Sequence, residues 1–292
     1  MTDQPRLLAS YFTLAGQVLP LVGSTVSPHS LEARARAAAD AGYCGLGLMT
    51  DDLQRLVAEH GFDGVKAIIA DSGLEHVEFE VLTDWFADGE RRVRADADRN
   101  FLLDAAERLG AYQIKVSGDL TGTDWPVETM RREFATLARQ AGDAGTMITI
   151  EIFPASNVRD LDTALAVVGD ANPAYGGLLL DVWHMNRGGI PYADFARIPA
   201  EYIRHIELDD ADAVQVGSII EDTILRRKLP GEGDFDVPSF LAHIADTGYT
   251  GLYGVEVLSD EMRSLSTAEA ARRSYDATMR AFARIPEARR AG

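Results

Sequence analysis

The sequence is poor in cysteine and in positive charge. Cys44 is the one cysteine, so no disulfide can form within the chain and nothing indicates an oxidising compartment. Lysine and arginine number 28 against 46 aspartates and glutamates, which gives a net charge of −18. Nucleic acids and anionic membranes bind proteins mainly through basic side chains, so neither is an expected partner.

Long hydrophobic runs are also lacking. No stretch approaches the roughly 20 apolar residues that cross a bilayer. Residues 7–23 are largely apolar and follow Arg6, as in a secretory signal, but Gln17 and Pro20 interrupt them and no small-residue cleavage site follows. We interpret this stretch as the start of a first strand and expect a cytoplasmic protein.

Short apolar runs rich in branched and aromatic residues recur along the chain, as in strands buried on both faces of a parallel sheet. They cover residues 7–15, 43–49, 76–82, 111–117, 146–153, 177–182, 202–208 and 252–258. Segments with apolar residues at helical spacing lie between most of them, at 31–39, 90–109, 127–141, 161–168, 237–246 and 268–282.

This alternation of strands and helices predicts parallel βαβ units. The number of units and the length predict an α/β protein, a single (β/α)8 TIM barrel over residues 1–292. A doubly wound open sheet is the main alternative, but residues 15–17 after the first strand, Ala-Gly-Gln, are not its phosphate-binding fingerprint.

Polar residues stand near the carboxyl ends of four consecutive predicted strands, where active sites of such barrels lie. Strand five carries Glu151, strand six ends with Asp181 and His184, strand seven offers His205 and Glu207, and strand eight carries Glu256. Carboxylates in apolar surroundings are costly unless they pair with a cation. Several carboxylates beside an imidazole therefore predict a divalent metal, with Mn²⁺ favoured over Mg²⁺, Co²⁺ or Zn²⁺.

With these residues in place, the chain resembles the xylose-isomerase-like TIM-barrel superfamily of sugar isomerases and epimerases, which also includes inosose dehydratases and endonucleases. The resemblance covers nearly the whole chain. Its specific parts are residues 150–151, 180–184, 203–210, 230–236 and 254–256.

The resemblance implies one divalent metal held by Glu151, Asp181, His205 and Glu256. It also implies that Glu151 and Glu256 flank the bound sugar, one removing the C–H proton and the other returning a proton. Relatives are often dimers or tetramers, so the resemblance allows a homo-oligomer.

The resemblance further places His184 against a substrate oxygen. Ketose 3-epimerases carry an arginine six residues after the strand-seven histidine, but here that position is Ala211. Arg226 or Arg227 could supply the missing contact.

Two more candidate substrate contacts come from the residues themselves. Trp85 is a candidate sugar-stacking ring, and Lys115, at the end of strand four, is a candidate contact that could equally be an amphipathic residue reaching the rim. Residues 117–119 and 231–234 carry acids where a phosphate would bind, so we expect an unphosphorylated sugar or polyol.

The first functional hypothesis is isomerisation or epimerisation of a ketose or related keto-polyol through an enediolate. The same enolate would serve a dehydratase or lyase acting on a 3-keto sugar or inosose, with His184, Lys115, Glu80 or Asp84 as the added acid. A non-catalytic sugar-binding barrel is a remote alternative. A nucleic-acid phosphodiesterase is disfavoured, because strand two ends without a histidine and the chain is acidic.

Overall fold

The computed structural model describes residues 4–285, so the ends of the predicted 1–292 domain, residues 1–3 and 286–292, lie outside the described residues. The described strands close into one parallel barrel in which each strand pairs with its neighbours in sequence and β1 pairs with β8. The strands are β1 Leu7–Ala9, β2 Gly45–Met49, β3 His76–Leu82, β4 Gln113–Val116, β5 Ile148–Glu151, β6 Gly176–Asp181, β7 Ile203–Leu208 and β8 Tyr253–Val255. The predicted TIM barrel is confirmed.

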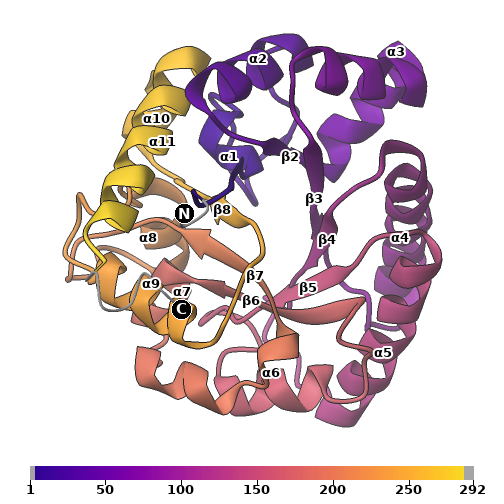
Figure 1. Ribbon diagram of the computed structural model, residues 1–292. Helices are drawn as coiled ribbons and strands as arrows, with labels where there is room; N and C mark the ends of the chain where they lie inside the picture. Colours follow the sequence, from indigo (N-terminus) through magenta and orange to yellow (C-terminus); the bar gives the residue numbers. More distant parts are fainter. Residues whose placement is uncertain (1–3, 286–292) are drawn as a thin grey trace.

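Helices surround this barrel, as the view along its axis shows (Figure 1). The α-helices are α1 Tyr11–Leu14, α2 Leu31–Ala41, α3 Thr50–Asp71, α4 Gly89–Leu109, α5 Val127–Asp143, α6 Leu161–Val168, α7 Val182–Arg187, α8 Ile219–Leu225, α9 Val237–Asp246, α10 Asp260–Ser264 and α11 Thr267–Ala283. Two 3₁₀ helices, η1 Tyr192–Arg197 and η2 Ala200–Tyr202, precede β7. None of the described helices is both long enough and apolar enough to cross a membrane.

Local sequence signals set several helix ends. The Ser30 side chain accepts a hydrogen bond from the Ala33 amide and caps α2, which ends at Gly42 with a φ of 109°. Asp236 caps α9 in the same way, with Pro238 in the first turn, where a missing N–H costs little. These positions agree with the predicted boundaries of both helices.

The first predicted strand, residues 7–15, is wrong in its second half. Strand β1 ends at Ala9, and Tyr11–Leu14 forms the short helix α1. Helix α3 was not anticipated by the periodicity. Its chain bends at Gly61, whose φ of 69° is outside the helical range. The apolar residues before and after the bend therefore do not follow one continuous helical spacing.

Polar side chains fill much of the barrel interior, and two glycines make room for them. A Cβ atom added to Gly47 of β2 would lie 2.3 Å from Glu80 Oε1. A Cβ added to Gly254 of β8 would lie 2.8 Å from His205 Nε2 and 3.1 Å from Glu207 Cγ. The absent side chains on β2 and β8 therefore create the space that long polar side chains from β3 and β7 occupy.

Candidate active site

Three carboxylates converge at the carboxyl ends of β6, β7 and β8. Asp181, the last residue of β6, is paired in register with Glu207 of β7, and Glu256 directly follows β8. Each offers an oxygen atom, and these oxygens lie within 4.8 Å of one another. Asp181 and Glu207 are buried and Glu256 is partly exposed, so the group sits at the floor of the barrel mouth.

The guanidinium of Arg227 lies among the carboxylates on one side of this group. Its Nη1 atom is 2.9 Å from Asp181 Oδ2, 2.6 Å from Asp209 Oδ2 and 3.0 Å from Glu256 Oε2. Its Nη2 atom donates to Thr223 Oγ1 and lies 3.1 Å from His184 Nε2. Burial raises the pKa of Asp209 and of Glu256, and neighbouring carboxylates raise both further, although Arg227 opposes the effect.

Lys115 of β4 supplies the second buried cation, below the carboxylates. Its Nζ atom bonds to Glu207 Oε1 and lies 3.0 Å from Glu78 Oε1 and 3.1 Å from Glu80 Oε1. Burial lowers the pKa of Lys115, but these three carboxylates outweigh burial and raise it well above its usual value. Lys115 therefore carries a fixed positive charge inside the barrel and does not reach the rim, where it was predicted.

His205 was predicted to bind a metal together with Asp181, but it lies one layer deeper in the barrel than Asp181. Its side chain is fully buried, and Nε2 is 3.5 Å from Glu78 Oε2. Its potential ligand atom groups with those of Glu78 and Glu207, whereas Asp181 and Glu256 group with Glu207. Among the described residues, the structure thus does not gather the predicted set Glu151, Asp181, His205 and Glu256 into one such group.

Glu151 ends β5 and faces the mouth of the barrel. Its Oε2 atom is 3.8 Å from His184 Nδ1, and its side chain is 23% exposed. Burial raises the pKa of Glu151 to about 7. The carboxylates of Glu207 and Asp181 raise this pKa as well, whereas a hydrogen bond from Ser117 lowers it. The carboxyl group can therefore both take up and release a proton near neutral pH.

His184, predicted to contact the substrate, is buried in the first turn of α7 beside this carboxyl. Burial and the charge of Arg227 lower its pKa well below the usual value, so the imidazole is neutral. Its Nδ1 atom is buried and has no hydrogen-bond partner, although Glu151 lies close by. A buried polar atom without a partner at the mouth of the barrel is suited to a bound molecule.

Two of the predicted substrate contacts lie elsewhere. Trp85 is 2% exposed and packs on Phe86 and Phe134, with its indole N–H donating to Ser117 O, so the ring belongs to the core. Arg226 is exposed, while its neighbour Arg227 holds the site. Of these two adjacent residues, the structure therefore places only Arg227 among the acids at the barrel mouth.

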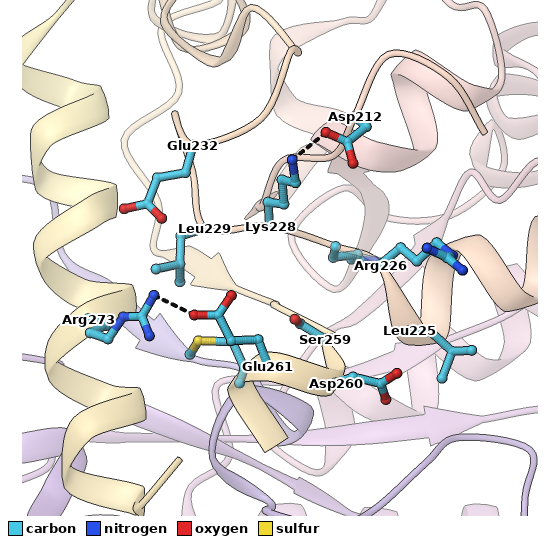
Figure 2. A pocket seen from close by; sticks show the side chains of 12 residues that line it. Asp212, Leu225, Arg226, Lys228, Leu229, Glu232, Ser259, Asp260, Glu261 and Arg273 are labelled. Atoms are coloured by element: carbon cyan, nitrogen blue, oxygen red, sulfur yellow. Dashed lines mark hydrogen bonds and ion pairs between the residues drawn. The ribbon is translucent and has the colours of Figure 1, made fainter. Parts of the chain in front are cut away.

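Arg226 lines, together with Arg227, a pocket of about 450 Å³ (Figure 2). This pocket lies between the segment that follows α8 and the start of α10 and α11. Mixed charges surround it and pair across it, Lys228 with Asp212 and Arg273 with Glu261, as the dashed lines in Figure 2 show. Because acidic and basic side chains line the pocket in equal number, it offers little net attraction for a charged ligand.

Asp210 organises the turn at residues 230–236, which the sequence singled out. Its carboxylate accepts hydrogen bonds from the backbone amides of Gly231 and Gly233 through Oδ2, and from Ala211 and Phe235 through Oδ1. The Asp210 carboxylate therefore ties this turn to the end of β7 through backbone hydrogen bonds. Glu232 points away from the site and pairs with Arg280.

Replacing Asp210 with asparagine is expected to loosen this turn. The amide nitrogen would face two backbone N–H donors, so the free energy of unfolding should fall by about 2–3 kcal/mol. Hydrogen exchange of residues 230–236 should accelerate in the same variant. The exposed Asp212→Asn variant is the control; equal exchange in the two variants would contradict the role of Asp210.

Sequence reasoning missed the interior acid Glu78, named Glu80 only as a candidate acid for elimination, and did not single out Glu207 or Asp209 as site residues. A usable signal was present, because Glu78 and Glu80 alternate along β3 as Gln113 and Lys115 do along β4. Such two-residue spacing places the polar side chains of neighbouring strands on the same face, here the barrel interior.

The chain is similar in sequence to enzymes of known activity. Its most similar relatives include a 3-dehydroshikimate dehydratase of Pseudomonas aeruginosa, 29% identical over 253 residues, and an inosose isomerase of Halalkalibacterium halodurans, 26% identical over 145 residues. The matches cover 82% and 49% of this chain, but only 38% and 50% of those proteins. The chain therefore spans half or less of the length of these enzymes.

Solved structures share the fold at lower identity. A structure described as an IOLI protein with a bound zinc atom superposes with a TM-score of 0.83 at 18% identity, over 97% of this chain and 99% of that one. The model of the family described as xylose isomerase-like TIM barrel matches residues 35–282, which include every polar residue of the barrel mouth described above. The chain belongs to the xylose isomerase-like TIM-barrel family.

Proposed function

We propose that this protein is a divalent-metal-dependent enzyme that moves a proton at the carbon beside a carbonyl, and so isomerises or epimerises an uncharged keto-polyol. The observation that carries the proposal is the convergence of Asp181, Glu207 and Glu256 beside the partly exposed Glu151. Family membership supports it, because relatives of this chain include isomerases and dehydratases.

The residues at the barrel mouth fit a divalent cation. Among the described residues that contact this group, buried or partly buried carboxyl groups outnumber the cations Lys115 and Arg227, so a surplus of negative charge remains. Glu151, Asp181 and Glu256 would hold the ion from three strands, with a fourth ligand from β7. An oxygen-rich set is typical of Mn²⁺ or Mg²⁺.

When bound, the ion supplies Lewis-acid stabilisation of the negative charge that develops on the substrate oxygens. The chain's own side chains move the proton. Glu151 and Glu256 come from strands β5 and β8, which lie apart in the barrel order, and we assign one as the base and the other as the acid. The neutral imidazole of His184 donates a hydrogen bond to a substrate oxygen, and Arg227 holds Glu256 and Asp181 in place.

The charge of the site favours an uncharged substrate. Among the described residues, both cations buried at the barrel mouth are already paired with carboxylates. A phosphate or carboxylate on the substrate would meet further acids instead of a free cation. Polyhydroxy ketones meet no such repulsion.

A dehydratase is the second candidate, because the 3-dehydroshikimate dehydratase of Pseudomonas aeruginosa matches 82% of this chain. Elimination from the same enolate needs an acid beside the leaving hydroxyl, and Glu151, which is partly exposed at the mouth, is our candidate for that role. Lys115 and Glu80 are buried below and bonded to each other, so they do not serve. Growth of enone absorbance in the ultraviolet would favour elimination, whereas solvent deuterium in an unchanged carbon skeleton favours isomerisation.

Glu151→Gln is expected to lower the rate of solvent-deuterium uptake into keto-polyols by a factor of about 10² or more, because glutamine cannot exchange the proton. The measurement uses candidate ketones with Mn²⁺ in D₂O, followed by mass spectrometry. The exposed Glu128→Gln variant should match the wild type. EDTA should abolish uptake and Mn²⁺ restore it. Full activity of Glu151→Gln, or activity indifferent to EDTA, would contradict the proposal.

A further inference from the structure

The β7 ligand of the metal can be assigned from the structure. We infer that Glu207, fixed by Lys115, binds the ion in place of His205, which makes the ligand set one of oxygen atoms only. This inference rests on the proposed metal dependence and deepens it, because it predicts which cations the site prefers.

The depth of the two side chains is the first step. Asp181 and Glu207 are register partners, whereas His205 is paired with Leu179, one layer further from the mouth. Side chains that alternate by two residues along a strand face the same interior but differ in depth. Glu207 therefore stands level with Asp181, and His205 lies below it.

The position of the cations is the second step. Lys115 already lies among Glu78, Glu80 and Glu207, so the inner group that contains His205 holds a positive charge of its own. A divalent ion in the inner group would lie among the three carboxylates that the ammonium already neutralises and would be repelled by it, whereas the outer group shares only Glu207 with the ammonium. Arg227 contacts the outer group of Asp181, Glu207 and Glu256: its Nη1 atom lies 2.9 Å from Asp181 Oδ2 and 3.0 Å from Glu256 Oε2. Its guanidinium also bonds to Asp209 and Thr223, so a bound ion would share Asp181 and Glu256 with a cation that is anchored to two further residues.

The two oxygens of Glu207 provide the third step. The hydrogen bonds from Ser10 and Lys115 both end on Oε1. Oε2 remains for another partner, and it belongs to a side chain that the lysine and the serine hold in one orientation. Among the described residues, His184 Nδ1 beside Glu151 and both ring nitrogens of His205 are buried without a hydrogen-bond partner. Unpartnered nitrogens therefore do not separate the two positions, and the strand register and the position of the cations decide between them.

An oxygen-only set has a consequence for metal choice. Imidazole nitrogen favours Zn²⁺ and other borderline ions, whereas carboxylate oxygen favours Mg²⁺ and Mn²⁺. We therefore expect His205 to have no part in binding, and we expect the preference of the site for Zn²⁺ over Mn²⁺ to be smaller than that of a site that contains a histidine.

The test is calorimetric titration of MnCl₂ into the EDTA-treated and dialysed full chain. Glu207→Gln should weaken Mn²⁺ binding at least tenfold, while His205→Gln should change it less than threefold. Circular dichroism and thermal unfolding of each variant without metal establish that it is folded. The electron paramagnetic resonance spectrum of bound Mn²⁺ gives a second readout, which should keep its wild-type form in His205→Gln.

The outcomes separate the inference from the function on which it rests. Weak binding by His205→Gln with normal binding by Glu207→Gln would overturn the assignment, and so would normal binding by both. Absence of Mn²⁺ binding to the wild type would overturn the metal dependence itself. Where Glu207→Gln does not fold, Glu207→Asp replaces it, and unchanged Mn²⁺ affinity in that shorter carboxylate would also count against the assignment.

Discussion

Replacing Arg227 with methionine is expected to lower the free energy of unfolding by about 3–5 kcal/mol when EDTA is present, because the change removes one partner of a buried ion pair. Arg227 is 3% exposed and contacts the carboxylates of Asp181, Asp209 and Glu256. Methionine fills most of the volume but leaves these acids without a cation, and they must take up protons or solvent. Urea denaturation followed by circular dichroism measures the loss.

The adjacent residue offers a matched control. Arg226 is exposed, so Arg226→Met should change the free energy of unfolding by less than about 0.5 kcal/mol. The Arg227→Met variant should also lose activity, since Glu256 is no longer held. Equal stability of the two variants would show that Arg227 does not neutralise the site.

Lys115→Met is expected to have a comparable effect, about 3–5 kcal/mol, from a separate group of charges. The ammonium lies among Glu78, Glu80 and Glu207, all buried, and also bonds to Ser10 Oγ. Without it, three carboxylates face one another across the barrel. The pKa of Glu80, raised by burial to about 7 with Lys115 present, would rise further in its absence.

A second substitution distinguishes lost charge from lost packing. Adding Glu80→Gln to Lys115→Met removes one of the stranded carboxylates while keeping an acceptor for the Tyr11 amide, so the double variant should regain part of the stability. The exposed Lys66→Met variant is the control for removing a lysine. A double variant less stable than Lys115→Met would contradict a charge-based explanation.

The sequence carried enough information for the barrel and for most of the strands. Strands β3 and β6 are continuous apolar or alternating runs, and their predicted ranges differ from the observed ones by one residue or less. Residues 11–14 were assigned to the first strand because their apolar side chains are equally compatible with a buried helical turn. The kink at Gly61 concealed α3 for a similar reason, since each half is short.

The depth of the site residues was beyond sequence reasoning. His205 and Glu207 both point into the barrel, and which one stands level with Asp181 depends on the stagger between β6 and β7. That register shifts near Leu178, and no local pattern announces the shift. Lys115 was placed at the rim because its acidic partners come from other strands, β3 and β7, and no local pattern shows that they meet it inside the barrel. Arg227 reaches the acids only because the chain folds back between β7 and β8.

That return of the chain has a consequence for how the protein meets its ligand. The backbone of Arg227 donates to Leu258 O at the end of β8, and Lys228 exchanges two backbone hydrogen bonds with Asp210 at the end of β7. The guanidinium is thus carried by a short main-chain bridge between two barrel strands, unlike a side chain on a hinged lid. The positive charge of Arg227 is therefore held in position before any ligand arrives. Binding does not have to order this side chain, so the reorganisation energy of the site is low.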